Sequence, residues 1–324
     1  MSKPALLSTG PMMPLISDQL EAAFDVHWMH KEGDLEAMLA SAGPRVEAVC
    51  TGSHTGVKTD KALMERLPAL KVIGNFGVGY DTIDVAAAAG RGIVITNTPD
   101  VLNEEVADTA LGLLLMTVRE LSKAEAYMRA GRWAEEGDYR LTPGSLRDRK
   151  IGMMGLGRIG RAITRRLEAF KLPISYYARR QQPDVSYPHY SDLVAMARDV
   201  DTLIAILPGG PDTQNIINAE VLKALGPRGI FINMARGSIV DEAALIAALR
   251  DKTILGAGLD VFWNEPKVNP AFLTLENATI VPHVGSASIF TRDQMGQLVV
   301  DNLLAYRERK PPKTPVPETP FKGW

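Results

Sequence analysis

The sequence predicts an α/β protein with two domains, each built on a doubly wound parallel sheet. Short apolar runs of strand length alternate with longer amphipathic runs over nearly the whole chain, as expected for parallel strands with helices on both faces. The 324 residues exceed the usual size of one hydrophobic core, so two domains are expected. A glycine-rich turn at residues 155–160 joins an apolar run to the amphipathic run that follows it, as in a βαβ unit.

The first part of the chain contains three predicted strands, at residues 46–51, 70–75 and 92–96. Each is too short for a stable helix and is closed by Gly, Asn or Thr. Helices are predicted between them at 59–67 and 82–90, with Gly90 at the C-cap of the second. A single long helix with an apolar centre is expected at 104–129, followed by a loop at 131–149.

The second part of the chain contains six further predicted strands with helices between them. They are expected at residues 150–155, 173–178, 202–207, 229–234, 254–260 and 278–283. Six strands arranged in this way fit one complete doubly wound sheet. The tail from Lys310 is rich in proline and is expected to be extended.

Composition and charge limit the possible partners. Hydrophobic residues make up 46% and charged residues 23% of the chain, as in ordinary globular proteins. The net charge of −2 gives no general electrostatic reason to expect nucleic acid or an anionic membrane as a partner. Cys50 is the only cysteine, so an internal disulfide is impossible and a reducing, cytoplasmic compartment is expected. No residues are assigned to a metal.

The glycine-rich turn predicts a dinucleotide site. It matches the pattern G-x-G-x-x-G, closes the strand KIGMM and opens the helix RAITRRLEAF. In this context the first glycine makes a tight turn, the second lets the backbone approach a pyrophosphate, and the third allows close helix–strand packing. The alternative is a glycine-rich turn without a ligand. The residues of the motif are Gly155, Leu156, Gly157, Arg158, Ile159 and Gly160.

The end of the next predicted strand indicates which nucleotide binds. An NAD site usually has an acidic residue there, which accepts hydrogen bonds from the ribose hydroxyls. Here the strand ends in Ala178, Arg179 and Arg180, and the first acid is Asp184. Two guanidinium groups would attract a 2′-phosphate, so NADP(H) is the predicted cofactor, with NAD(H) still possible. The alternative is a solvated basic turn.

Three polar residues follow successive predicted strands and could form a reacting centre. Arg236 follows the strand at 229–234, Glu265 lies beyond the strand at 254–260, and His283 ends the strand ATIVPH. Hydride transfer to a 2-oxo acid needs a cation for the carboxylate, a group that polarises the carbonyl, and an acid. These residue types at the carboxyl ends of parallel strands favour that chemistry. His54, just after the strand at 46–51, is the one positional rival of His283 and is assigned no role.

Five segments carry a resemblance to a known family: NFGVGYDTID (75–84), GLGRIG (155–160), NMARGSIVDEAAL (233–245), GAGLDVFWNEP (256–266) and PHVGSAS (282–288). They resemble the D-isomer-specific 2-hydroxyacid dehydrogenase family over residues 45–310. Within it, the chain is most similar to the glyoxylate/hydroxypyruvate reductases, including the hydroxyphenylpyruvate reductases. Glyoxylate, hydroxypyruvate, 2-ketogluconate and phenylpyruvates all fit this resemblance as substrates.

The resemblance implies roles for the site residues. Arg236 would clamp the substrate carboxylate and carbonyl, and His283 would donate the proton during reduction. Glu265 would pair with His283 and keep it charged. The backbone amides of Val78 and Gly79 would complete the binding of the carboxylate. The residues expected around the cofactor, besides the glycine-rich turn and the two arginines, are Thr109, Ala178, Leu207, Pro208, Met234, Ala235, Arg236, Asp260, His283, Gly285 and Ser286.

The resemblance also implies an architecture. A Rossmann cofactor domain at 99–286 would be inserted into a flavodoxin-like substrate domain formed by 1–98 and 287–324, with a catalytic cleft between them. The segment around Trp133 resembles a dimer arm that reaches toward the partner's active site, so a homodimer is expected. A merely packed tryptophan is the alternative reading.

Two other classes stay open. One is an NAD-dependent dehydrogenase of the D-3-phosphoglycerate or formate type. The longer phosphoglycerate enzymes carry an extra domain for which this chain has no room, and formate dehydrogenases place Gln before the histidine, where this chain has Pro282. The other is a nucleotide-sensing binding protein that resembles the C-terminal-binding corepressors, and fold alone does not exclude it.

Overall fold

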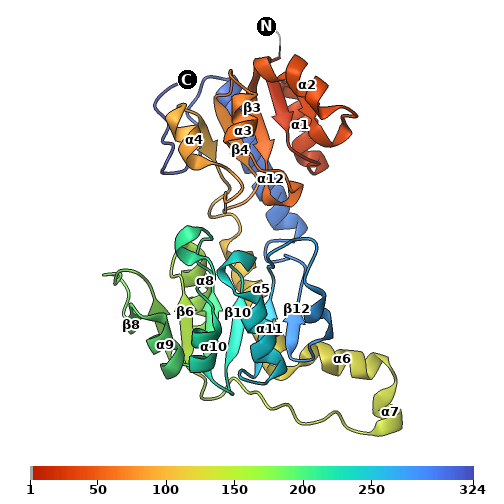
Figure 1. The fold of residues 1–324 in the computed structure, drawn as a ribbon, viewed down its shortest axis with the longest axis vertical. Helices are drawn as coiled ribbons and strands as arrows, with labels where there is room; N and C mark the ends of the chain where they lie inside the picture. The colour runs from red at the N-terminus through yellow and green to blue at the C-terminus, as the bar shows by residue number, and fades with distance from the viewer. Residues whose placement is uncertain (1–2) are drawn as a thin grey trace. The chain divides into compact units, whose positions relative to one another are not determined.

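The structure is a computed structural model that describes residues 3–324. The chain forms two compact units (Figure 1). The first contains the chain up to Leu102 together with Ser288–Trp324, and the second contains Asn103–Ala287. The chain therefore leaves the first unit, completes the second, and returns to the first with its last helix.

The first unit is built on a five-stranded parallel sheet in the order β2-β1-β3-β4-β5. The three predicted strands are present as β3 (Val46–Thr51), β4 (Val72–Asn75) and β5 (Val94–Thr96). Two strands were not predicted, β1 (Ala5–Ser8) and β2 (Asp25–Trp28), because each has only four residues and so shows no clear periodicity. The strand order is that of flavodoxin-like sheets.

Helices cover both faces of this sheet. On one face lie α1 (Pro14–Ala23) and α12 (Ile289–Arg307), which pack against each other, and α12 also packs against β4. On the other face, α2 (Leu35–Ser41), α3 (Lys61–Glu65) and α4 (Val85–Gly90) contribute Met38, Met64 and Ala88 to a buried core. Short 3₁₀ turns occur in this unit at Met29–Lys31, Gly43–Arg45 and Ser53–Thr55.

The second unit is built on a seven-stranded parallel sheet in the order β12-β11-β10-β9-β6-β7-β8. All six predicted strands are present: β6 (Ile151–Met154), β7 (Ile174–Tyr177), β9 (Thr202–Ala205), β10 (Ile230–Asn233), β11 (Gly256–Leu259) and β12 (Ala278–Ile280). The seventh, β8 (His189–Tyr190), is a two-residue edge strand. The strand order reverses between β6 and β9, as in a Rossmann sheet, and ligands bind at such a switch point.

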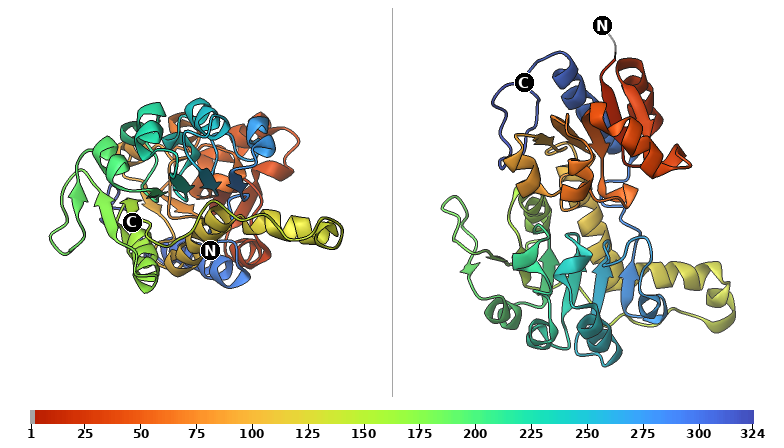
Figure 2. Two further views of the ribbon diagram at one scale, coloured as in Figure 1. Left: turned by 90° about the horizontal axis from the view of Figure 1, so that it is seen from below. Right: turned by 45° about the horizontal axis from the view of Figure 1, so that its top comes forward.

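The helices of the second unit lie on both faces of its sheet, as Figure 2 also shows. On one face lie α5 (Asn103–Arg119) and α8 (Arg158–Ala169), which pack against each other. On the other lie α9 (Leu193–Asp199), α10 (Ala219–Leu225) and α11 (Glu242–Arg250). Further 3₁₀ turns are at Pro211–Thr213, Gly237–Ile239 and Pro270–Thr274. A Cβ on Gly258 would lie 2.6 Å from Thr117 Oγ1, so α5 packs very closely on β11.

The prediction of one helix over 104–129 is wrong, because the chain breaks at Glu120. There the backbone adopts a left-handed conformation with φ 51° between α5 and α6 (Leu121–Arg129). The Glu120 carboxylate accepts from Lys123 Nζ at 3.0 Å and pairs with Arg140 at 2.6 Å, and these contacts hold the break. The predicted loop at 131–149 also contains a short helix, α7 (Arg132–Glu136), which extends away from the sheet with α6 (Figure 1).

The proline-rich tail is extended, as predicted. Over 308–324 the chain has no helix or regular strand, and it runs along β5. The N–H of Val316 donates to Ile95 O at 2.9 Å, and the Val316 side chain is buried. Within residues 3–324, no helix has the length and apolar character needed to cross a bilayer.

Candidate active site

A histidine–carboxylate pair lies beyond the carboxyl ends of β11 and β12. His283 Nδ1 and Glu265 Oε2 are 2.6 Å apart. The other carboxylate oxygen of Glu265 accepts from the backbone N–H of Phe262 at 2.9 Å, which fixes the carboxylate in place. Since Nδ1 is committed to Glu265, Nε2 is the ring nitrogen of His283 that can meet a substrate.

The electrostatic environment keeps Glu265 ionised. Burial alone would raise the pKa of this carboxyl. The hydrogen bond with His283, the positive charges of His283 and Arg236, and the N–H of Phe262 outweigh burial, so the pKa is lowered. Arg236 and His283 therefore both lie near enough to Glu265 for their charges to lower its pKa.

Arg236 stands in a turn that Asn233 organises at the end of β10. The side chain of Asn233 donates to Arg236 O at 3.0 Å and accepts from the N–H of Ala235 at 3.0 Å. The next residue must be glycine, because a Cβ on Gly237 would lie 1.9 Å from the carbonyl carbon of Phe262. Arg236 itself is half-buried, and its Nη1 donates to Ala235 O at 2.6 Å.

Asp260 clamps the loop that carries His283. Its two carboxylate oxygens accept from the N–H groups of Val284 at 2.6 Å and Gly285 at 2.9 Å, and the residue is 2% exposed. Burial raises its pKa, against the hydrogen bonds from the two amides and the charge of His283. His283 has φ 51°, a costly conformation for a non-glycine residue, and the clamp helps to hold it there. The sequence analysis missed this role of Asp260.

Two of the predicted cofactor contacts also touch this loop. Thr109 Oγ1 donates to Gly285 O at 3.2 Å, and Met234 Cε would lie 3.2 Å from a Cβ on Gly285. A Cβ on Gly285 would also lie 2.9 Å from Asp260 Oδ2, so a larger residue at this position would displace the Asp260 carboxylate. Ala235 and Ser286 adjoin these residues in the chain. Their contacts with a cofactor stay a prediction.

The glycine-rich turn has the geometry that a dinucleotide needs. Gly155 has φ 95°, in the region that favours glycine, and a Cβ on Gly160 would lie 2.3 Å from Gly155 O. A Cβ on Gly157 would meet nothing within 4 Å, so open space lies over the N-terminus of α8. That terminus has no side-chain cap, which leaves its amide groups for an anion. Leu207, before Pro208, packs its N–H beside Gly155.

The two arginines after β7 lie exposed at the same edge of the sheet. The Arg179 side chain is 85% exposed and contacts Asp212 at 3.2 Å, and Arg180 is also exposed. Near them, Gln182 was missed by the sequence analysis. Its Nε2 donates to Leu156 O at 3.3 Å, and its Oε1 accepts from Arg161 at 2.7 Å, so it ties this segment to the glycine-rich turn. No pattern in the sequence distinguishes that glutamine.

Val78 and Gly79 lie in the first unit, in the loop after β4. Their carbonyl groups face inward, because Asn75 Nδ2 donates to Gly79 O at 2.9 Å and Asn97 Nδ2 donates to Val78 O at 2.9 Å. Within residues 3–324, the N–H groups of Val78 and Gly79 make no backbone hydrogen bond, so they are available as donors. Gly77, with φ 147°, allows this reversal of the chain.

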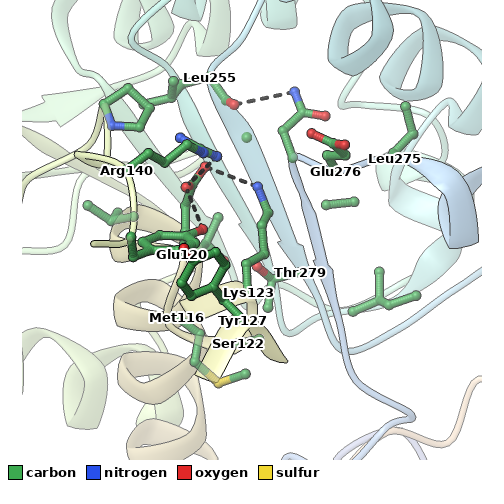
Figure 3. Close-up of a pocket in the computed structure, with 18 of the residues that line it drawn as sticks. Met116, Glu120, Ser122, Lys123, Tyr127, Arg140, Leu255, Leu275, Glu276 and Thr279 are labelled. Atoms are coloured by element: carbon green, nitrogen blue, oxygen red, sulfur yellow. Dashed lines mark hydrogen bonds and ion pairs between the residues drawn. The ribbon is translucent and has the colours of Figure 1, made fainter. Parts of the chain in front are cut away.

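A pocket of about 710 Å³ lies elsewhere in the second unit, beside the amino ends of β11 and β12. Figure 3 shows Glu120 between Lys123 and Arg140 at its centre, with Tyr127 beside them. The predicted catalytic residues are at the carboxyl ends of the strands, so this pocket lies at the opposite edge of the sheet from them. Glu120 pairs with Lys123 and Arg140, and Arg132 pairs with Glu136.

Comparison with known families identifies the lineage of this site. A family model described as the D-isomer specific 2-hydroxyacid dehydrogenase, NAD binding domain, matches residues 111–285, which is more than half of the chain. The chain belongs to the D-isomer-specific 2-hydroxyacid dehydrogenase family. The resemblance inferred from the sequence is thereby confirmed, as is the predicted fold of two parallel-sheet units.

Individual family members match over almost the whole chain. Hydroxyphenylpyruvate reductase from Plectranthus scutellarioides is 40% identical over 311 residues, covering 96% of this chain and 98% of that protein. 2-Ketogluconate reductase from Gluconobacter oxydans is 40% identical over 317 residues, covering 97% and 99%. The crystal structure of an NADPH-dependent glyoxylate/hydroxypyruvate reductase from Sinorhizobium meliloti, in complex with NADP and malonate, is 49% identical with a TM-score of 0.93, covering 99% of this chain and 98% of that one.

Proposed function

We propose that this protein reduces small 2-oxo acids to D-2-hydroxy acids, with NADPH as the preferred hydride donor and NADH as a possible one. The observation that carries the proposal is the 2.6 Å contact between His283 and Glu265, within the electrostatic reach of Arg236. An acid held by a carboxylate next to a guanidinium group suits the reduction of a carbonyl beside a carboxylate. The names of the 40% identical relatives, reductases of hydroxyphenylpyruvate and 2-ketogluconate, support it.

The residues of the chain divide the chemistry between them. Reduced nicotinamide, when bound, supplies the hydride. Arg236 holds the carboxylate and polarises the carbonyl with its planar fork of donors. His283 gives the proton from Nε2 to the new alkoxide, and Glu265 orients the ring through Nδ1 and stabilises its charged form. The N–H groups of Val78 and Gly79 bind the substrate carboxylate, so the first unit is the substrate domain and the second the cofactor domain.

The cofactor would be held by backbone amide groups and by positively charged side chains. Open space at Gly157 and the uncapped start of α8 fit a pyrophosphate, and Arg179 and Arg180 fit a 2′-phosphate. Asp260, with a second lone pair on each carboxylate oxygen, can still accept from the nicotinamide amide while it holds its loop. The solved relative with 49% identity contains NADP, which favours the same choice here.

The activity is tested by following the loss of NADPH absorbance with glyoxylate, hydroxypyruvate, 2-ketogluconate and phenylpyruvate as substrates. We expect turnover with at least one of these acids at a kcat in the ordinary range of about 1–1000 s⁻¹. Negligible turnover with all of them, despite tight binding of NADPH, would favour a nucleotide-sensing binding protein instead.

We also propose that the protein is a homodimer that pairs through the arm formed by α6 and α7. Leu121 and Met128 are seven residues apart, so they share one face of α6, and they are 47% and 56% exposed. Trp133 on α7 is 56% exposed. A second copy would cover these apolar side chains. Light scattering should give twice the chain mass of 35.2 kDa for the wild type and a monomer for Leu121→Asp/Met128→Asp. A wild-type monomer would refute this proposal.

We further propose a cytoplasmic location, which the state of Cys50 supports. It is buried, and burial raises the pKa of its thiol to about 12, so it suits a reducing compartment and no disulfide. Fractionation of the cells that produce the protein tests this, and recovery from an extracellular or periplasmic fraction would contradict it.

A further inference from the structure

We propose that the C-terminal segment 313–319 is a positioning element for the loop that binds the substrate carboxylate. This segment and the loop at 76–80 both belong to the first unit, and Asn97, just after β5, hydrogen-bonds to both. The inference rests on the proposed function, in which the N–H groups of Val78 and Gly79 bind the carboxylate. It names the residues that hold those two donors in place.

The two N–H groups of the loop take their direction from the carbonyl groups that precede them. Because a peptide unit is planar and trans, the N–H of Gly79 points opposite to the C=O of Val78, and the N–H of Val78 opposite to the C=O of Gly77. Asn97 Nδ2 donates to Val78 O at 2.9 Å, and the N–H of Thr98 donates to Gly77 O at 3.1 Å. Asn97 and Thr98 therefore set the direction in which both donors point.

Asn97 is held in turn by the C-terminal segment. Its backbone N–H donates to Thr314 O at 3.2 Å, and its carbonyl oxygen accepts from Thr314 Oγ1 at 2.6 Å. Both backbone groups of Asn97 are thus bonded to one residue of the segment. A displacement of Thr314 would therefore move Asn97 and, with it, the peptide unit between Val78 and Gly79.

Thr314 is anchored by a fully buried side chain of α12. Asn302, which is 0% exposed, donates from Nδ2 to Thr314 Oγ1 at 2.8 Å. Its Oδ1 accepts from the N–H groups of Lys313 at 2.8 Å and Thr314 at 3.1 Å. The hydroxyl of Thr314 thus accepts from Asn302 and donates its one hydrogen to Asn97. A side chain without a hydroxyl cannot complete this chain of hydrogen bonds.

A second contact connects the other end of the segment to the same loop. The Tyr80 hydroxyl donates to the Glu318 carboxylate at 3.1 Å. Burial and this hydrogen bond raise the pKa of Tyr80 to about 12, so the hydroxyl keeps its proton at neutral pH. Between the two contacts Val316 is buried, and Thr319 Oγ1 accepts from the N–H of Ile95 at 2.9 Å, which fixes the segment along β5. The segment therefore contacts the carboxylate-binding loop at two separate points.

The expected consequence is an effect on substrate binding rather than on the chemical step. Donors that are already aimed before the substrate arrives lower the entropic cost of ordering them when it binds. The substrate carboxylate is present in the bound substrate and in the transition state alike, so a weaker hold on it raises KM and leaves kcat nearly unchanged. NADPH, which would bind to the second unit, should not respond.

The test removes the Thr314 hydroxyl at nearly constant shape. Thr314→Val should raise the KM for glyoxylate and hydroxypyruvate about 3–10-fold, as when one hydrogen bond is lost, with kcat and the KM for NADPH within about twofold of the wild type. Thr314→Ser keeps the hydroxyl and should have the wild-type KM. The matched control is Thr274→Val, because the Thr274 hydroxyl also donates to a backbone carbonyl but lies in the second unit.

Hydrogen exchange adds a measurement that does not depend on turnover. The amides of residues 76–80 should exchange about threefold faster or more in Thr314→Val, and at wild-type rates in Thr314→Ser and Thr274→Val. Glu318→Ala removes only an exposed contact and should change KM and loop exchange in the same direction by a smaller factor. This variant decides the question if Thr314→Val does not fold.

Wild-type exchange of the loop in Thr314→Val would overturn the proposal, and so would a wild-type KM despite faster exchange. Equal losses in Thr314→Val and Thr314→Ser would also overturn it, as would a fall in kcat with an unchanged KM. A wild type that reduces no 2-oxo acid would instead refute the proposed function. The exchange rates of the loop distinguish that case from a failure of the contacts made by the C-terminal segment.

Discussion

Replacing Arg179 and Arg180 by serine should change the cofactor preference without disturbing the reaction. If these side chains bind the 2′-phosphate of NADPH, the double variant loses charge-assisted hydrogen bonds that NADH never makes. The kcat/KM for NADPH should then fall, while that for NADH stays nearly constant.

The exposure of the two arginines sets the size of the effect. A hydrogen bond to a charged group is worth about 1.5–3 kcal/mol when it is protected from water, and an exposed ion pair about 0.2–1 kcal/mol. Because the Arg179 side chain is 85% exposed, we take about 1 kcal/mol for each arginine. The pair then contributes about 2 kcal/mol, which is roughly 30-fold in kcat/KM for NADPH.

Asp212, the acidic neighbour of Arg179, provides a second test of the same prediction. Asp212 lies 3.2 Å from Arg179 and competes with a phosphate for it, so Asp212→Asn should improve the KM for NADPH and leave that for NADH unchanged. The preference of the wild type for NADPH should also weaken at high ionic strength, since the screening length is about 8 Å at physiological salt.

Steady-state kinetics with both cofactors and one substrate decide the outcome. The charge-matched control is Arg198→Ser/Arg250→Ser, because these exposed arginines lie at the C-terminal ends of α9 and α11. Equal losses for NADPH and NADH in Arg179→Ser/Arg180→Ser, or no loss for either, would refute the reasoning. So would a wild type that uses the two cofactors equally well.

Three further predictions concern the catalytic residues. His283→Ala should lower kcat by about 10²–10⁴ with little change in NADPH affinity measured by fluorescence titration, and near-normal turnover would place the acid elsewhere. Arg236→Lys keeps the charge but loses the planar fork, so kcat/KM should fall by on the order of 10²–10³, whereas retained activity would mean that backbone amides alone hold the carboxylate. For Glu265, the lowered pKa stabilises the fold above the ordinary carboxyl pKa of about 4.3, and this contribution is lost as the pH falls through the lowered value. The stability advantage of the wild type over Glu265→Gln, measured by urea unfolding, should therefore be full at neutral pH and vanish in acid, and an advantage that grows in acid would contradict this.

Long periodic segments and strand ends could be predicted from the sequence because their signals are local. Nine strands have clear apolar runs, and Arg236, Glu265 and His283 were found by the rule that polar groups of parallel sheets act beyond the carboxyl ends. The strands β1, β2 and β8 have two to four residues, too few for a period to appear. The break at Glu120 could not be predicted either. Glu120 pairs with Arg140, twenty residues further on, and no local breaker residue marks the break.

The polar contacts that hold the candidate active site could not be predicted from the sequence for a related reason. A buried carboxylate after a strand is a common pattern. The sequence around Asp260 does not indicate that its two oxygens accept hydrogen bonds from the amides of Val284 and Gly285. Those contacts help to hold the conformation of His283, whose positive φ is unfavourable on its own. The sequence thus indicates His283 as a candidate reacting group, because it is a histidine at the end of a predicted strand. The direction in which it points depends on a partner 23 residues away, which becomes apparent only when β11 and β12 lie side by side.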